Sequence, residues 1–152
     1  MPTTIYALAA DHGGFALKEE IRKYLDSRGV RYIDFGTDSA APVDYPPYAH
    51  LACAAVLDGR CGAGILCCGT GNGMAMTANK HRGIRCVCCS DVYTARYARL
   101  HNDANMLALG GRVVGPGLAQ ELVAAFVDTQ FEGGRHAKRL EMVEKIEREN
   151  GG

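Results

Sequence analysis

Cys68 stands at the entrance to a glycine-rich turn, and this position makes it the first candidate for chemistry. The stretch GILCCGTGNGMAMTANK, residues 64–80, has the pattern of a buried strand, then a turn, then a helix. Backbone N–H groups at such a turn, together with the dipole of the following helix, favour a negatively charged group. A thiol beside a helix N-terminus loses its proton more readily and can act as a base. Cys68 is therefore either such a base or a packing residue.

The turn GTGNG, residues 69–73, fits neither of two common phosphate-binding motifs. It lacks the Gly-Lys-Ser/Thr ending of a Walker loop, and its glycine spacing is not that of a dinucleotide fingerprint. A tight turn that needs a positive φ angle explains one glycine but explains three poorly. We therefore expect the amides of this turn to face an anion, with Cys67 pointing away from it into the packing of the sheet.

A carboxylate and an imidazole follow the first predicted strand. Asp11 and His12 come directly after TIYALAA, residues 4–10. We expect this strand to neighbour the one that ends at Cys68. A carboxylate and an imidazole that meet a thiol can move protons or bind a polar ligand, although Asp11 alone could be a helix N-cap.

Three arginines form a possible phosphate clamp. Arg135 and Arg139 are four residues apart, so they share one face of the last predicted helix near its start, where a cation is unfavourable unless an anion is bound. Arg112 follows the fifth predicted strand. Arginine supplies bidentate donors that suit phosphate, and His12 would add another. Each arginine by itself could be a solvated surface residue.

His101 lies in HND, residues 101–103, between a predicted helix and the fifth predicted strand. In a parallel sheet this position belongs to the amino edge, whereas Cys68 ends its strand at the carboxyl edge. His101 is therefore either a loop residue or a part of the site of another subunit.

Alternating strand and helix patterns position all of these residues. The predicted strands are 4–10, 30–36, 63–68, 84–89 and 105–110, and the predicted helices are 11–29, 46–59, 73–80, 91–102, 117–129 and 137–149. Near-continuous apolar strands joined by helices imply a parallel sheet that is covered on both faces. We predict a Rossmann-like three-layer α/β sandwich, one domain over residues 1–152, with strand order 2-1-3-4-5 and a ligand site at the carboxyl edge.

Composition limits the partners of the chain. Lys and Arg total 17, as do Asp and Glu, so no global field favours nucleic acid or an anionic membrane. Met1 to Ala10 lacks the pattern of a signal peptide, and no apolar run approaches membrane length. Most of the seven cysteines suit buried positions in a reducing compartment, and Cys86 and Cys89 should point to opposite faces of one strand. We expect a cytoplasmic protein without a metal site.

Taken together, these residues resemble the type B ribose-5-phosphate isomerase family, which also includes the galactose-6-phosphate isomerase subunits. The similar pieces are DHGGFALK, VDYP, GILCCGTGNGMAMTANK, GIR, HNDANMLALGGRVVG and FEGGRH, in order along nearly the whole chain. The resemblance implies isomerisation of an aldose phosphate to a ketose phosphate through a cis-enediolate, with no metal or organic cofactor. The implied substrates are ribose 5-phosphate and ribulose 5-phosphate of the pentose phosphate pathway. The alternative is a six-carbon sugar phosphate, such as allose 6-phosphate or galactose 6-phosphate, because one extra carbon is discriminated only weakly in a pocket.

The resemblance also implies a role for each candidate residue. Cys68 would transfer the proton between C1 and C2; some relatives use a glutamate after the turn, but no acid lies in 69–80. Thr70 would hold the sugar oxygens, and His101 would open the furanose ring with help from Asp11. The implied substrate contacts are His12, Tyr45, Gly69, Gly71, Asn72, Gly73, Asn102, Arg112, Arg135 and Arg139.

The family builds each site from two chains, which implies a homodimer or tetramer with the C-terminal helix used in dimerisation. Its galactose-6-phosphate enzymes divide the catalytic residues between two different subunits. This chain keeps both Cys68 and His101, which favours a homo-oligomer. Two other classes are a non-catalytic sugar-phosphate sensor, which could lose the base, and a flavodoxin-like redox protein, whose loop after the first strand should be rich in hydroxyl groups.

Overall fold

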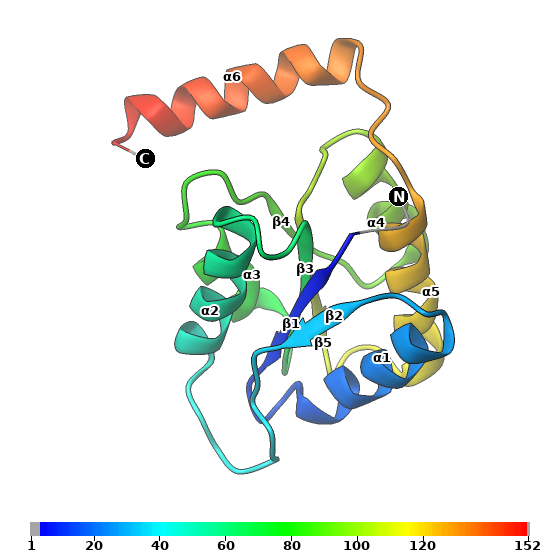
Figure 1. Ribbon diagram of the computed structural model, residues 1–152. Helices are drawn as coiled ribbons and strands as arrows, with labels where there is room; N and C mark the ends of the chain where they lie inside the picture. Colours follow the sequence, from blue (N-terminus) through cyan, green and yellow to red (C-terminus); the bar gives the residue numbers. More distant parts are fainter. Residues whose placement is uncertain (1–3, 152) are drawn as a thin grey trace.

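Five short strands form a parallel sheet at the centre of the molecule (Figure 1). The computed structural model describes residues 4–151. The predicted domain extends over 1–152 and the predicted N-terminal segment begins at Met1, so residues 1–3 and 152 of these predictions lie outside the described residues. The strands are β1 Tyr6–Ala10, β2 Tyr32–Asp34, β3 Ala63–Cys68, β4 Cys86–Cys88 and β5 Met106–Gly110. The helices are α1 Phe15–Ser27, α2 Tyr45–Leu57, α3 Asn72–Ala78, α4 Val92–Leu100, α5 Pro116–Asp128 and α6 Arg135–Glu149.

The strand order is β2-β1-β3-β5-β4, so the predicted order 2-1-3-4-5 is wrong for the last two strands. β1 does neighbour β3, as predicted, but β5 rather than β4 pairs with the other side of β3. The reason lies in the two sequences. All five residues of β5 are buried, whereas β4 is three residues long and leaves Cys88 exposed. The fully buried strand β5 takes an inner position beside β3, and the short, partly exposed strand β4 takes the edge.

Helices cover both faces of the sheet and form two separate cores. α2 and α3 pack on one face, and α1, α4 and α5 pack on the other (Figure 1). Successive residues of a strand point to opposite faces. Cys67 therefore enters the core beneath α1, α4 and α5, and Cys68 enters the core beneath α2 and α3. Cys86 and Cys89 also lie in different cores, which confirms that their side chains point to opposite faces.

α6 stands away from the sheet and its covering helices (Figure 1). The chain reaches it through Gly133 and Gly134, whose φ angles are 73° and 59°. Positive φ is available to glycine at little cost, so this pair lets the chain turn sharply into the helix. Within α6 only His136 is buried, and the apolar residues Met142, Val143 and Ile146 are exposed. The use of α6 in dimerisation stays a prediction. Over residues 4–151, no helix has the length and apolar character needed to cross a membrane.

Candidate functional site

The thiol of Cys68 lies at the carboxyl end of β3 and faces the glycine turn. Its side chain is buried, and the Gly71 N–H donates a hydrogen bond to Sγ at 3.0 Å. Gly71 has a φ angle of 87°, a left-handed conformation that suits glycine and aims this amide back at the sulfur. The sulfur of Cys68 is therefore held against the glycine turn by a backbone amide of that turn.

The other cysteines, except the exposed Cys88, are buried packing residues. Loss of water around the sulfur raises the pKa of each of them, to about 11 for Cys53 and higher still for Cys67. The same cause raises the pKa of Cys61, Cys86, Cys88 and Cys89. These six thiols remain protonated near neutral pH, so none of them is a competing candidate for a general base.

Backbone hydrogen bonds fix the loops on either side of this thiol. The Asp11 N–H donates to the Cys67 carbonyl at 3.2 Å, which joins the loop after β1 to the end of β3. On the other side, the Arg112 N–H donates to the Gly69 carbonyl at 3.0 Å. A Cβ on Gly110 would lie 2.7 Å from the Thr70 carbonyl carbon, so glycine is required for this close approach. Three loops thus form one rigid edge.

Asp11 and His12 are both held in place within this edge. Asp11 is buried, and its Oδ1 accepts a hydrogen bond from the Gly14 N–H at 3.1 Å, close to the start of α1. The carboxylate therefore organises the turn before the helix, although the N-cap itself is Gly14. Nδ1 of His12 lies 3.1 Å from both the N–H and the carbonyl oxygen of Val43, so this ring nitrogen is held against the loop before α2 and Nε2 is left for other partners.

Arg112 and Tyr45 lie against the glycine turn from two sides. A Cβ on Gly69 would lie 3.1 Å from Nη1 of Arg112, and a Cβ on Gly73 would lie 2.7 Å from the Tyr45 ring. The structure therefore brings a set of the predicted residues to one edge of the sheet, which we call the carboxyl-edge cluster. Its members are Asp11, His12, Tyr45, Cys68, Gly69, Thr70, Gly71, Asn72, Gly73 and Arg112.

His101 lies at the opposite end of the sheet, as the predicted topology requires. It is the C-cap of α4, just before β5, whereas Cys68 pairs with Gly110 at the far end of that strand. Four residue steps along a parallel strand span about 13 Å. The structure therefore does not bring His101 and Cys68 together within one chain.

The His101 ring stacks on the ring of His136, with centroids 3.9 Å apart and planes 15° apart. The Glu132 N–H donates to the Leu100 carbonyl at 3.0 Å, which holds the segment before α6 against the end of α4. Arg135 and Arg139 occupy the start of α6 and are exposed. We call this second group the amino-edge cluster; its members are His101, Asn102, Glu132, Arg135, His136 and Arg139.

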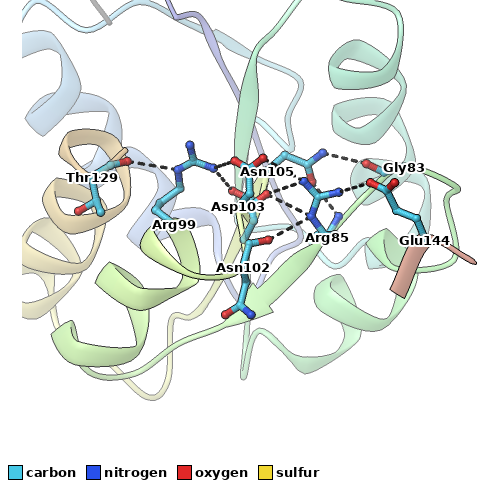
Figure 2. A network of polar contacts seen from close by, with 9 residues as sticks. Gly83, Arg85, Arg99, Asn102, Asp103, Asn105, Thr129 and Glu144 are labelled. Atoms are coloured by element: carbon cyan, nitrogen blue, oxygen red, sulfur yellow. Dashed lines mark hydrogen bonds and ion pairs between the residues drawn. The ribbon is translucent and has the colours of Figure 1, made fainter. Parts of the chain in front are cut away.

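An ion-pair network fixes the HND loop (Figure 2). The Asp103 carboxylate accepts from Arg99 at 2.9 Å and from Arg85 at 3.3 Å, and Asp103 has a φ angle of 44°. Arg85 also donates to the Asn102 carbonyl and pairs with Glu144 of α6 at 3.5 Å. Asp103 therefore has a structural role, because it anchors the backbone that carries His101.

His136 is a member of this cluster that the sequence analysis missed. Its side chain is buried, and its Nε2 has no hydrogen-bond partner among residues 4–151. Loss of water around the ring and the nearby His101 lower its pKa. Oε1 of Glu132 lies 3.8 Å from Nε2, and His101, Glu132 and His136 each place a possible metal ligand within 4.8 Å of the others. The available signal was its place in FEGGRH, directly after Arg135.

Two cavities lie away from the thiol. One, of about 790 Å³, opens at the amino edge, where Arg28 pairs with Asp128 at 2.6 Å. The other, of about 340 Å³, lies between β4 and α4, and Cys88 and Asn102 are both part of its lining. Cys68 lines neither of these two cavities.

Comparison with known proteins identifies the family of the chain. A family model described as Ribose/Galactose Isomerase matches residues 6–143. Ribose-5-phosphate isomerase B of Escherichia coli is 50% identical over 141 residues, which cover 93% of this chain and 95% of that protein. D-erythrulose-4-phosphate isomerase of Pectobacterium atrosepticum is 42% identical and covers 90% of this chain and 91% of its own length. The structure of Clostridium thermocellum ribose-5-phosphate isomerase B superposes with a TM-score of 0.94 at 46% identity, over 96% of this chain and 99% of that one. The chain belongs to the ribose/galactose isomerase family.

Proposed function

We propose that this protein interconverts ribose 5-phosphate and ribulose 5-phosphate through a cis-enediolate, with Cys68 as the base. Membership of the family makes the chain a sugar-phosphate isomerase, and two of its similar proteins are named for ribose 5-phosphate. The observation that supports Cys68 is the N–H of Gly71, in the turn at 69–73, which lies 3.0 Å from the sulfur. In this proposal a base and an oxyanion site lie side by side.

The reaction requires one proton to move between two neighbouring carbons. In our proposal the Cys68 thiolate removes the proton from C2 of the open-chain aldose, and the electron pair forms the enediolate. Amides of residues 69–73 would stabilise the negative oxygen, as preorganised donors do in an oxyanion hole. The thiol then returns the proton to C1, while a proton passes from O2 to O1, and the ketose results. Thr70, exposed beside the thiol, would bind the sugar oxygens.

Substrate binding in this proposal requires two chains. Arg112 and His12 would contact the phosphate from the carboxyl edge, and Arg135 and Arg139 of a partner chain would complete the clamp. His101 of the partner would open the furanose ring with Asp11, because within one chain His101 lies at the wrong end of β5. Tyr45 and the partner's Asn102 would bind substrate hydroxyls. The proposed active form is a homodimer, or a tetramer built from it.

A different sugar is the second candidate. The family description includes galactose, and one similar protein is named for a four-carbon phosphate. The chemistry is the same for each sugar, because the reacting atoms are C1 and C2 in all of them. A six-carbon phosphate, such as allose 6-phosphate or galactose 6-phosphate, is one carbon longer, so it would need a pocket with room for that carbon.

The test is a substrate panel. Four-, five- and six-carbon aldose phosphates are assayed under identical conditions, and kcat/KM is compared. We expect ribose 5-phosphate to give the highest value. A higher value for a four- or six-carbon substrate would assign the chain to that sugar, and no turnover of any of them would contradict the proposed function as a whole.

A further inference from the structure

Lys18 lies in the first turn of α1, and its side chain is only 1% exposed. Its ammonium donates to the Asp34 carboxylate at 2.7 Å and to the Glu19 carboxylate at 3.1 Å. A cation is unfavourable in the first turn of a helix, and a buried ion pair seldom stabilises a fold more than apolar residues of similar volume would. Stability alone therefore does not explain why a lysine occupies this position.

The Asp34 carboxylate links this ammonium to the backbone of the loop that follows β2. Its Oδ2 accepts from Lys18, and its Oδ1 accepts a hydrogen bond from the Gly36 N–H at 2.9 Å. Because the ammonium holds one oxygen, the carboxylate keeps one orientation and its other oxygen stays directed at the loop. Apolar side chains at these two positions could fill the space, but they could not hold the Gly36 amide.

The loop after β2 is bonded to both sides of the residue that precedes Asp11. The Ala10 N–H donates to the Gly36 carbonyl at 2.6 Å, and the Thr37 N–H donates to the Ala10 carbonyl at 2.7 Å. Ala10 and Thr37 are both buried, so water does not compete for these bonds. The direction in which the chain leaves β1 towards Asp11 is therefore fixed by this loop.

The first turn of α1 makes a second connection to the same carboxylate. The Lys18 N–H donates to the Gly14 carbonyl at 2.9 Å, and the Gly14 N–H donates to Oδ1 of Asp11 at 3.1 Å. Lys18 is thus joined to Asp11 through its own helix, and also through Asp34 and the loop after β2. A carboxylate that is held from both directions has little freedom, as a group that acts on a substrate requires.

We propose that Lys18 and Asp34 are a positioning pair, which holds the Asp11 carboxylate in place for the substrate without touching the substrate itself. The pair's role rests on the proposed function, in which Asp11 helps the partner's His101 to open the sugar ring. Misplacement of such a group by about 1 Å can lower the rate about 10²-fold. Loss of the pair should therefore lower kcat, whereas KM should change little because the phosphate clamp remains.

Paired substitutions separate this role from stability. The apolar pair, Lys18→Met/Asp34→Leu, removes the acceptor for the Gly36 N–H, whereas the neutral pair, Lys18→Gln/Asp34→Asn, removes both charges but keeps an amide oxygen as that acceptor. We expect the apolar pair to lower kcat for ribose 5-phosphate at least about tenfold, and the neutral pair to stay within about threefold of the wild type. Both should melt close to the wild-type temperature, because apolar replacement of a buried ion pair is often neutral.

Two outer members of the same group of charges are the matched controls. Glu19 accepts from Lys18 at 3.1 Å, and Arg22 pairs with Asp34 at 3.3 Å, but the Gly36 N–H bonds to neither of them. Glu19→Gln and Arg22→Gln should therefore keep both kcat and KM. If the apolar pair fails to fold, Lys18→Gln/Asp34→Ala takes its place, since it differs from the neutral pair only at position 34, where the acceptor is lost.

Amide hydrogen exchange, measured by NMR, adds a readout that does not depend on activity. The amides of Ala10 and Thr37 should exchange faster in the apolar pair than in the neutral pair. Unchanged kcat in the apolar pair, an equal loss of kcat in both pairs, or a change confined to KM would overturn the positioning role. Absence of turnover in the wild type would instead contradict the proposed function, and the exchange rates would then decide whether the pair fixes the segment that carries Asp11.

Discussion

The two clusters differ in how they are held. Backbone hydrogen bonds join the loops of the carboxyl-edge cluster on both sides of Cys68, and both Cys68 and Asp11 are buried. The amino-edge cluster has a stacked pair of histidines at its centre, but its arginines are exposed on a helix that stands away from the sheet. The proposed base is thus fixed within one chain, whereas the two arginines of α6 that would complete the phosphate clamp face outward.

Replacement of the proposed base should have the largest effect. Cys68→Ala should lower kcat by at least about 10²–10⁴-fold, the usual contribution of a general base, while substrate analogues still bind because the arginines remain. Steady-state kinetics and analogue binding by calorimetry measure the two properties. Cys67→Ala is the matched control and should keep most of its activity, because its side chain lies in the other core. Equal losses in the two variants would mean that the thiol of Cys68 is not the base.

Mixing two inactive variants tests whether the clusters meet across chains. Cys68→Ala and His101→Ala are each impaired alone, but a mixed dimer would contain one site with both groups intact and one site with both lesions. After mild dissociation and random reassociation of the chains, about half of the dimers are mixed, and each mixed dimer has one intact site of its two. Activity should therefore return to about a quarter of the wild-type value. If subunit exchange is demonstrated by mass spectrometry and activity is still absent, the shared site is wrong.

Loss of one clamp arginine should have a smaller effect, confined to binding. Arg139→Ala should raise KM about tenfold, equivalent to about 1.4 kcal/mol, with kcat nearly unchanged. Lys138→Ala, an exposed cation on the preceding position of α6, is the control and should change neither parameter. A fall in kcat at constant KM in Arg139→Ala would contradict a role in phosphate binding.

Removal of metal should have no adverse effect. Neither the proposed base nor the proposed clamp needs a metal, so activity in EDTA should equal that of the untreated enzyme. The assay is initial rate before and after dialysis against EDTA. A loss of activity that Zn²⁺ or Mg²⁺ restores would show that catalysis depends on a metal.

Local patterns in the sequence were sufficient to predict the elements. Each strand and helix lies close to its predicted range because apolar periodicity and glycine stops such as Gly29, with a φ angle of 68°, act over a few residues. The edge on which each candidate lies was also predictable, because a residue that follows a strand must lie at the carboxyl edge of a parallel sheet.

Features that depend on distant contacts were not predictable. The exchange of β4 and β5 depends on which strand better fills the centre of the sheet, and the two apolar runs look similar in the sequence. Burial of His136 depends on its stacking with a residue 35 positions earlier, His101. Lys18 is only 1% exposed, and its ammonium donates a hydrogen bond to the carboxylate of Asp34 in β2 at 2.7 Å. No local pattern in the sequence indicates this pairing.

The position of β5 has a consequence for synthesis on the ribosome. Within residues 4–151, β4 has β5 as its only neighbour in the sheet, and β3 lacks a partner on that side until β5 has been synthesised. The edge of β3 that leads to Cys68 must therefore remain uncovered until the chain has emerged beyond Gly110. An open apolar strand edge invites pairing with other chains. Ribosome pausing before Gly110 should promote aggregation of the nascent chain, whereas pausing after α5 has emerged should not.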